Sequence, residues 1–200
     1  MKEALEKIQK ILEKSILNYD KASIIISGGS SPTNLVHALN NLDIEWKKVK
    51  VMLLDERLVK ENNEHSNEQY LKKNFFKNYS KNARYQKIRN LIIDDKIDLA
   101  ILGFGTDGHF ASIFPCHLKD NKFIDITKEP MILQTDKVGN PCVARLTMNL
   151  SAFSKVENIF IIINSQEKFE VINNAKHDKS LPIHYLLNLE YPNIKTVKDF

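Results

Sequence analysis

The hydrophobic positions of the chain follow two different spacings in turn. Apolar residues three or four positions apart, with Lys and Glu between them, predict an amphipathic helix through Leu5, Ile8, Leu12 and Ile16. Short runs rich in β-branched residues come next along the chain. They are too short for helices and predict buried strands at 22–27, 49–54 and 97–102.

Polar capping residues and Pro mark where further helices begin. Ser30 and Ser31 before Pro32 predict a helix start, and Ser66 or Asn67 predicts another. Ser165 caps a third predicted helix. Weaker patterns predict short helices at 85–93 and 181–187. They also predict strands at 131–134, 143–148 and 158–163, and an edge strand at 194–197.

Strands that alternate with helices indicate one α/β domain over residues 1–200. The expected architecture is a doubly wound, mainly parallel sheet with helices on both faces. Ligands bind such sheets beyond the carboxyl ends of the strands. The three chemically unusual segments each follow a predicted strand directly, at 28–32, 55–57 and 105–109. We therefore expect them to meet at one edge of the sheet.

Composition narrows the class of protein further. The chain has 200 residues, is 42% hydrophobic, and carries a net charge of +4 from 29 Lys and Arg against 25 Asp and Glu. No apolar run approaches the roughly 20 residues of a spanning helix, and the N-terminus does not resemble a signal peptide. A cytoplasmic protein that is a monomer or a small homo-oligomer is expected. Neither a membrane nor nucleic acid is an expected partner, because no basic stripe carries interleaved aromatic residues.

Cysteine and histidine usage gives no sign of a disulfide framework or a metal. The two cysteines, Cys116 and Cys142, are not arranged as CxxC, and the six histidines lack HxxxH or HExxH spacing. We expect no metal site and no cofactor. The five histidines other than His109 are interpreted as surface or packing residues.

The first unusual segment has the composition of an anion-binding loop. Gly28, Gly29, Ser30 and Ser31 lie between a strand and a helix N-terminus. Glycine lets the backbone approach a ligand closely, and the free N–H groups of the helix start favour an anion such as phosphate. A plain strand–helix turn with a serine cap is the alternative.

The second segment, Asp55-Glu56-Arg57, brings charge to the same edge. In an extended chain Asp55 and Arg57 point to one side and Glu56 to the other. Arg57 would bind phosphate or carboxylate, or else close a surface ion pair. Arg145 lies in a strand otherwise suited to burial, so it needs a partner, for which an anionic ligand is one candidate. Lys168 begins a later helix and faces either this edge or solvent.

The third segment, from Gly103 to Gly108, matches GxGxxG, which in other contexts indicates a dinucleotide site. We discount that interpretation because the motif follows a later strand than the first, and because Asp107 would repel a pyrophosphate. His109 follows within the same turn, and a nearby carboxylate both orients an imidazole and strengthens it as a base. Gly105, Asp107 and His109 are therefore candidate site residues, with a loop-stabilising hydrogen bond as the alternative role of His109.

Five stretches together resemble the 6-phosphogluconolactonases, which share a superfamily with the glucosamine-6-phosphate deaminases. They are ISGGSSP (26–32), LLDERLV (53–59) with HSN (65–67), DLAILGFGTDGHFASIFP (98–115) and RLTMNL (145–150). The resemblance runs in order over nearly the whole chain, and Lys168 and Leu181-Pro182 fall at matching positions. The chain is shorter than the family pattern before Asp98 and between Pro115 and Arg145, and it lacks the usual Gly after Phe114-Pro115.

The resemblance implies a Rossmann-like fold of the NagB/RpiA type and hydrolysis of 6-phospho-D-glucono-1,5-lactone to 6-phosphogluconate in the pentose phosphate pathway. It implies His109 as general base with Asp107 beside it. Gly28, Gly29, Ser30, Ser31, Arg57, Arg145 and Lys168 would hold the phosphate, with Asp55 nearby. Backbone N–H groups of the 105–109 turn would stabilise the oxyanion.

Two alternatives remain open from the sequence. One is an aminosugar-phosphate isomerase or deaminase. In the resemblance, those enzymes have the sequence DEY where this chain has Asp55-Glu56-Arg57, and they have a Glu where this chain has Phe114. The other is a non-catalytic sugar-phosphate sensor, which would be expected to lack His109 or Asp107.

Overall fold

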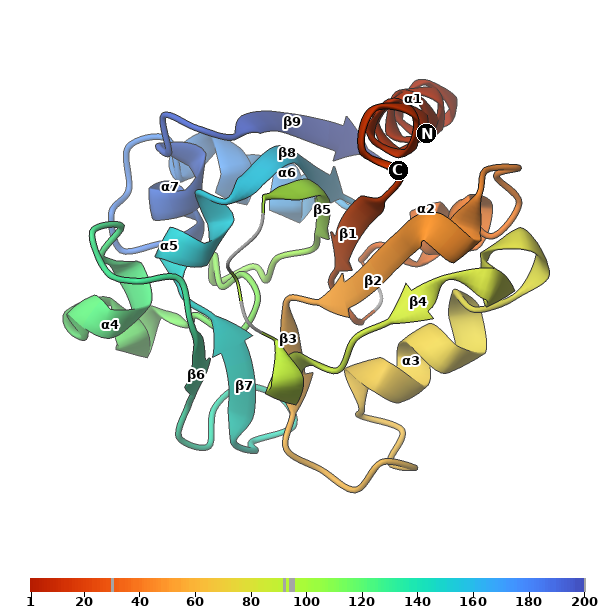
Figure 1. Ribbon diagram of the computed structural model, residues 1–200. Helices are drawn as coiled ribbons and strands as arrows, with labels where there is room; N and C mark the ends of the chain where they lie inside the picture. The colour runs from red at the N-terminus through yellow and green to blue at the C-terminus, as the bar shows by residue number, and fades with distance from the viewer. Residues whose placement is uncertain (30, 92, 94–95, 200) are drawn as a thin grey trace.

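A computed structural model describes residues 1–29, 31–91, 93 and 96–199, and its centre is a six-stranded parallel sheet (Figure 1). The strands are β1 (Ala22–Ile26), β2 (Val49–Leu53), β4 (Arg84–Tyr85), β5 (Ile97–Leu102), β8 (Val156–Ile163) and β9 (Asn193–Lys198). Their spatial order is β4-β2-β1-β5-β8-β9. Counted along the chain within this sheet, that is 3-2-1-4-5-6, the order of a doubly wound dinucleotide-binding sheet.

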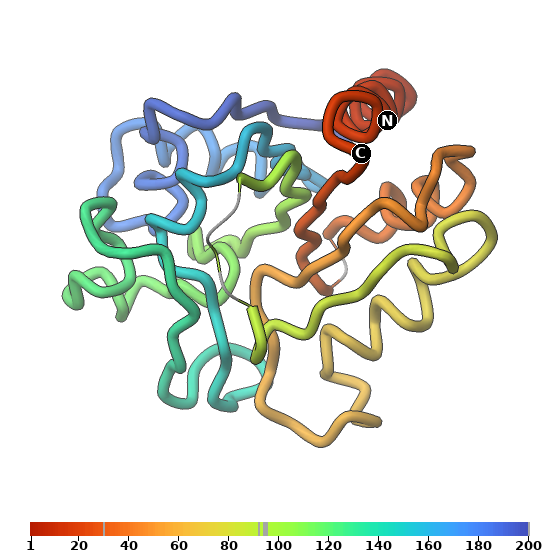
Figure 2. The backbone as a smooth tube through the Cα atoms, viewed as in Figure 1, coloured from red at the N-terminus to blue at the C-terminus, as the bar shows by residue number. Residues whose placement is uncertain are grey.

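Helices cover both faces of this sheet, as expected. On one face α1 (Lys2–Tyr19), α2 (Thr33–Leu39) and α3 (Asn67–Asn74) pack on inward residues such as Ile24 and Ile101. On the other face α5 (Leu150–Phe153), α6 (Gln166–Asn174) and α7 (Pro182–Leu187) pack on residues such as Ala100 and Ile161. The short α4 (Asn121–Ile124) adds Phe123 to this second cluster. Figure 2 traces the backbone through these elements.

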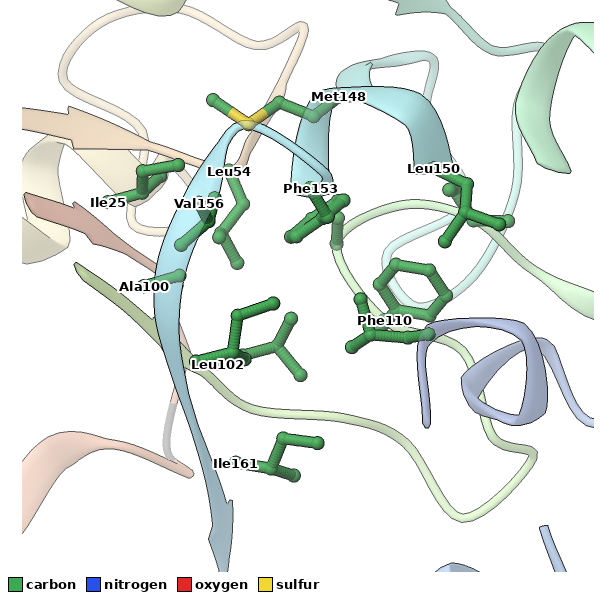
Figure 3. Packing of buried hydrophobic residues seen from close by; sticks show 14 of the residues in the cluster. Ile25, Leu54, Ala100, Leu102, Phe110, Met148, Leu150, Phe153, Val156 and Ile161 are labelled. Atoms are coloured by element: carbon green, nitrogen blue, oxygen red, sulfur yellow. The ribbon is translucent and has the colours of Figure 1, made fainter. Parts of the chain in front are cut away.

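The second cluster packs between the sheet and the helices on this second face, and Figure 3 shows part of it. Phe110, which follows the glycine-rich turn, packs edge-on against Phe153 with ring centroids 5.4 Å apart. Leu102 and Ile161 are neighbours across β5 and β8, and neither is exposed to solvent. Burying each such side chain stabilises the fold by about 1.5–3 kcal/mol, and this anchors the turn after β5 to the core.

A smaller antiparallel sheet continues from the carboxyl edge of the large one. It consists of β3 (Asp55–Arg57), β7 (Arg145–Met148) and β6 (Ile132–Gln134), in the order β3-β7-β6. The two sheets join at Leu54, whose N–H donates to Ile26 and whose carbonyl accepts from Met148. This junction fixes β3 directly beyond the end of β2.

Two local predictions are wrong. The described residues of the segment 85–93 do not form one short helix: Arg84–Tyr85 pairs with β2, and of these residues only Ile88–Asn90 turns as a 3₁₀ helix. Pairing with an adjacent strand overrides the weak helical pattern. The helix after the first glycine loop begins at Thr33, with Pro32 as its N-cap and no side-chain cap. Ser31 is instead engaged with Lys168, and Ser30 lies outside the described residues.

Over the described ranges, further 3₁₀ helices lie at Trp46–Lys48, Asn78–Asn82 and Pro115–Lys119. The predicted caps at Ser66 and Ser165 are confirmed, because each side chain accepts a hydrogen bond from a backbone N–H of the helix it precedes. The helix at 181–187 and the edge strand at 194–197 are also confirmed, as α7 and β9.

Candidate active site

The three unusual segments meet where the strand order reverses, between β1 and β5. Ser27 links the carboxyl ends of β1 and β5: its N–H donates to the carbonyl of Ile101, and its hydroxyl accepts from the N–H of Gly103 at 2.8 Å. A cavity of about 250 Å³ opens here. It is lined by Ser27, Gly28, Gly29, Ser31, Asp55, Arg57, Asn67, Gly103, Phe104, Gly105, His109, Ala111, Arg145 and Lys168. The prediction of a shared edge is therefore confirmed.

A larger cavity of about 610 Å³ lies at the opposite ends of the strands, lined by side chains such as Ser23, Lys50 and Asp98. It contains none of the candidate residues. Volume alone does not identify the site. The smaller cavity lies at the reversal of strand order, where sheets of this kind bind ligands.

The loop after β1 passes close to the start of α3. A Cβ on Gly28 would lie 2.1 Å from Asn67 Oδ1, so only glycine fits there. Gly29 has a φ of 82°, a left-handed conformation that glycine adopts without strain. Lys168 Nζ, from the first turn of α6, donates to Ser31 Oγ at 2.6 Å. Of the two orientations left open for Lys168, the structure shows the one toward the cavity.

In β3 the side chains alternate as predicted. Asp55 and Arg57 line the cavity. Glu56 points away and accepts hydrogen bonds from the backbone N–H groups of Asn67 and Glu68, at 2.8 and 2.7 Å, and from the Ser66 hydroxyl. Burial raises the pKa of Glu56, and these hydrogen bonds oppose that rise. Glu56 therefore ties β3 to the N-terminus of α3 and takes no part in the cavity.

Asp55 does not hold Arg57. Its carboxylate is 5% exposed and accepts from Ser112 Oγ at 2.6 Å and from Asn67 Nδ2 at 3.1 Å. Arg57 donates from Nη1 to the carbonyl of His65, while its buried Nε has no hydrogen-bond partner among the described residues. A buried donor without a partner is costly in the free protein and suits a ligand acceptor.

Arg57 and Arg145 are directly opposite each other across β3 and β7. Two like charges in this position repel. Burial, followed by the charge of Arg57, lowers the pKa of Arg145. Arg145 is 3% exposed and donates to the carbonyls of Val138 and Pro141, which supplies the partner that its burial requires.

Lys168 adds a third positive charge to the cavity. Burial lowers its pKa. Within the described part of the chain, no carboxylate lies within 4.0 Å of the charged nitrogens of Arg57, Arg145 or Lys168. Three cations without ion-pair partners in one cavity favour an anionic ligand.

The turn after β5 pairs His109 with Asp107. The imidazole Nδ1 lies 2.5 Å from Asp107 Oδ1, and the backbone N–H of His109 donates to the same oxygen. Partial burial works against the Asp107 carboxylate, but its hydrogen bonds with His109 and the charge of His109 outweigh this and lower the pKa of Asp107. An ionised carboxylate at Nδ1 favours the tautomer with a proton on Nδ1, which leaves Nε2 as the basic nitrogen.

The backbone of this turn limits one expectation, that N–H groups of residues 105–109 stabilise an oxyanion. The N–H groups of Gly103, Gly105, Gly108 and His109 all donate within the protein, to Ser27 Oγ, the His109 carbonyl, the Gly105 carbonyl and Asp107 Oδ1. These four amides are therefore not free to stabilise an oxyanion. A tight turn satisfies its own donors because each is brought close to an acceptor of the same turn.

Three residues of the site carry no local sequence signal of their functional contacts. Asn67 was considered as a helix cap, yet its side chain lines the cavity and holds Asp55. Ser112 is fully buried against Asp55, and Phe114 stacks on His109. The motifs HSN and FASIFP contain these residues, but nothing in their local pattern shows which way the side chains face.

The fold and the site together define an α/β protein with a cavity at its topological switch point, lined by three cationic side chains, and a histidine–carboxylate pair at that cavity. Comparison with known proteins makes this class specific. The chain belongs to the family of glucosamine-6-phosphate isomerases and 6-phosphogluconolactonases, whose model matches residues 1–93 and 80–191.

Several relatives of this chain are 6-phosphogluconolactonases. A 6-phosphogluconolactonase of Helicobacter pylori strain J99 is 31% identical, over 94% of this chain and 88% of its own. One of Thermotoga maritima is 28% identical, over 93% and 89%. The crystal structure of the Thermotoga maritima 6-phosphogluconolactonase matches with a TM-score of 0.81 at 25% identity, over 98% and 94% of the two chains. That of Shewanella baltica reaches 0.85 at 23% identity, over 98% and 91%, and shows the shared fold.

Proposed function

We propose that this protein hydrolyses 6-phospho-D-glucono-1,5-lactone to 6-phosphogluconate, with residues 1–200 acting as one sugar-phosphate lactonase domain. The observation that carries the proposal is the His109–Asp107 pair beside a cavity with three cations that have no carboxylate partner among the described residues. The relatives' name, 6-phosphogluconolactonase, supports the substrate. The pentose phosphate pathway uses this lactone, so we expect a cytoplasmic enzyme.

The phosphate group is held by the positive charges of the cavity. Arg57 offers its buried Nε, Lys168 its ammonium group, and the Gly28–Gly29 loop a close backbone approach. Arg145 contributes mainly its positive charge, because two of its nitrogen donors already form hydrogen bonds to backbone carbonyls. Charge-assisted hydrogen bonds contribute about 1.5–3 kcal/mol each. Binding the phosphate in this way fixes the lactone carbonyl relative to His109.

Nε2 of His109 takes a proton from a water molecule as its oxygen attacks the lactone carbonyl carbon, forming a tetrahedral intermediate. The bond between that carbon and the ring oxygen then breaks, and the imidazolium returns its proton to the departing oxygen. The products are a hydroxyl on the opened chain and a carboxylic acid, which ionises in water. Asp107 keeps Nδ1 protonated and stabilises the imidazolium between these two steps.

The isomerases and deaminases that share the family offer a second reaction, and the position of Phe114 argues against it here. The ring of Phe114 stacks directly on His109, with centroids 4.2 Å apart, where the resemblance places a Glu in the deaminases. A phenyl ring moves no proton. We therefore expect no ammonia release from glucosamine 6-phosphate.

The remaining expectations concern partners and assembly. All residues proposed for the reaction come from one chain, so a monomer or a small homo-oligomer is sufficient, and no nucleic acid takes part. Of the helices that the structure describes, none combines the length and the apolar character needed to cross a membrane.

The test is hydrolysis of freshly generated lactone, coupled to 6-phosphogluconate dehydrogenase and corrected for spontaneous ring opening. We compare wild type with His109→Ala, and with His37→Ala, which removes an exposed histidine outside the cavity. Loss of a general base lowers kcat by about 10²–10⁴-fold. Equal rates for wild type and His109→Ala would remove the histidine from the mechanism. No rate above the blank would leave a sugar-phosphate binding protein.

A further inference from the structure

A planar stack supports the imidazole of His109 on one of its faces. The rings of His109 and Phe114 are 4.2 Å apart between centroids and inclined by only 19°. Phe114 is buried, at 7% exposure, and is not among the residues that line the cavity. Any effect of Phe114 on the reaction must therefore pass through His109.

The same phenyl ring lies near a fixed positive charge. The guanidinium carbon of Arg145 is 5.2 Å from the centroid of Phe114. Gly139 allows this packing, since a Cβ there would lie 2.6 Å from Phe114 Cζ and 2.7 Å from Arg145 Nη2. Arg145 is held by the carbonyls of Val138 and Pro141, so it does not depend on the ring for its place.

The face of a phenyl ring is electron-rich and attracts a cation more than a neutral group. In the proposed reaction the imidazole starts neutral and becomes an imidazolium as the water molecule is deprotonated. The contact with Phe114 is therefore stronger in the transition state than in the ground state. Only contacts that strengthen in this way accelerate the chemical step.

We propose that Phe114 is a positioning residue that fixes the plane of the His109 imidazole and stabilises the imidazolium formed during hydrolysis. The proposal rests on the proposed function, in which His109 is the base. Asp107 acts on the Nδ1 edge of the imidazole and Phe114 on its face, so two contacts from different directions fix one side chain. Among the described residues, the other charged side chains that line the cavity with His109 are those of Asp55, Arg57, Arg145 and Lys168.

The test variant is Phe114→Leu, which keeps an apolar side chain and removes the flat ring. We expect kcat/KM on its pH plateau to fall about 3- to 30-fold. We also expect its acid limb to move to lower pH by about half a unit or more. Without the ring the imidazolium is less stable, so more acid is needed to protonate His109, and the basic form persists further down the pH scale.

The chain supplies a matched control. Phe123 is 3% exposed and stacks on His117, with centroids 4.3 Å apart and planes inclined by 16°. Phe123→Leu removes the same volume from the core and breaks the same kind of ring pair, but His117 lies outside the cavity lining. We expect it to lower Tm as Phe114→Leu does, and to leave kcat/KM and its acid limb as in wild type.

A spectroscopic readout separates this role from general damage. We would follow the His109 ring signals by NMR through a pH titration of wild type, Phe114→Leu and Phe114→Met. A downward shift of the titration midpoint in both variants, with slower turnover, supports the proposal. Slower turnover with an unchanged acid limb and midpoint would reduce Phe114 to a packing residue and overturn it.

Two outcomes separate this inference from the proposed function. If His109→Ala abolishes hydrolysis while Phe114→Leu matches wild type in rate and pH profile, the function stands and the inference fails. If His109→Ala hydrolyses the lactone at the wild-type rate, His109 is not the base, and the proposed function of this site fails first.

Discussion

The ammonium nitrogen of Lys168 donates to the hydroxyl of Ser31 at 2.6 Å, which joins the first turn of α6 to the loop after β1. Lys168 also lies over the ring of Phe104, with its nitrogen 5.3 Å from the centroid. These contacts hold a half-buried cation at the cavity, and in the part of the chain that the structure describes its charge has no carboxylate partner. A ligand phosphate would supply the missing charge.

Lys168→Met should therefore weaken substrate binding more than it slows chemistry. A lost charge-assisted contact of about 1.5–3 kcal/mol corresponds to a KM roughly 10- to 150-fold higher. Steady-state kinetics on freshly generated lactone measures this. Lys176→Met, at an exposed position just after α6, is the control and should match wild type. A fall in kcat with KM unchanged would place Lys168 at the reacting carbon instead of the phosphate.

The pH dependence of product binding should follow the same lysine. Burial lowers the pKa of Lys168, so the ammonium group loses its proton at a lower pH than an ordinary lysine of about 10.4. Affinity for 6-phosphogluconate should be full at neutral pH and fall as pH rises toward that value. The ligand is not the cause, because a phosphate monoester is already fully ionised well above its second pKa of about 6.

Calorimetric titration of 6-phosphogluconate across the alkaline range measures this effect with a stable ligand. Lys168→Arg keeps the positive charge at every pH used, so its affinity should stay level where that of wild type falls. An equal alkaline fall in both proteins would assign the titration to another group.

Asp107→Asn should slow the reaction while leaving substrate binding nearly intact. The amide of Asn presents either a donor or an acceptor to Nδ1, so the tautomer with a basic Nε2 is no longer enforced. We expect kcat to fall about 10²–10⁴-fold, with KM changed much less. Asp43→Asn, which alters an exposed carboxylate outside the cavity lining, is the control. A variant with normal kcat would show that His109 is oriented by Phe114 and the turn alone.

The sequence was sufficient to predict where the site lies. Each candidate loop follows a strand, and the carboxyl ends of parallel strands share an edge, so Gly28, Asp55 and Gly105 had to meet. The sequence was not sufficient to predict which groups meet there. That Arg57 faces Arg145 depends on the register of β3 against β7, and that Phe114 covers His109 depends on the path of the chain between two turns.

The wrong helix prediction for the segment 85–93 has a related cause. Its apolar residues suit a short helix, but Tyr85 is placed by pairing with Val51 of β2, a contact that no local pattern contains. Similarly, the glycine motif at 103–108 does not show which of its amides are free to bind a ligand. The turn folds back on itself, and the carbonyl of His109 accepts from Gly105.

Gly28 and Gly29 should respond to alanine for different reasons. In Gly28→Ala the new Cβ would lie 2.1 Å from Oδ1 and 2.3 Å from Cγ of Asn67, a residue that is 2% exposed and has no room to withdraw. In Gly29→Ala the Cβ meets nothing within 4 Å, and the cost is the left-handed φ of 82°. Overpacking costs about 1–3 kcal/mol of unfolding free energy and the left-handed backbone about 1–2 kcal/mol.

Urea unfolding of the double variants separates these two causes. Asn67→Ala opens the space that the Gly28→Ala methyl needs, so the pair should be more stable than the sum of the single effects predicts, by about 0.5–3 kcal/mol. Asn67→Ala offers no such relief to Gly29→Ala, because strain in φ does not depend on the neighbouring side chain, and that pair should be additive. Additivity in both pairs would show that the loop moves aside to admit a methyl at Gly28. In that case close approach to Asn67 is not what requires glycine there.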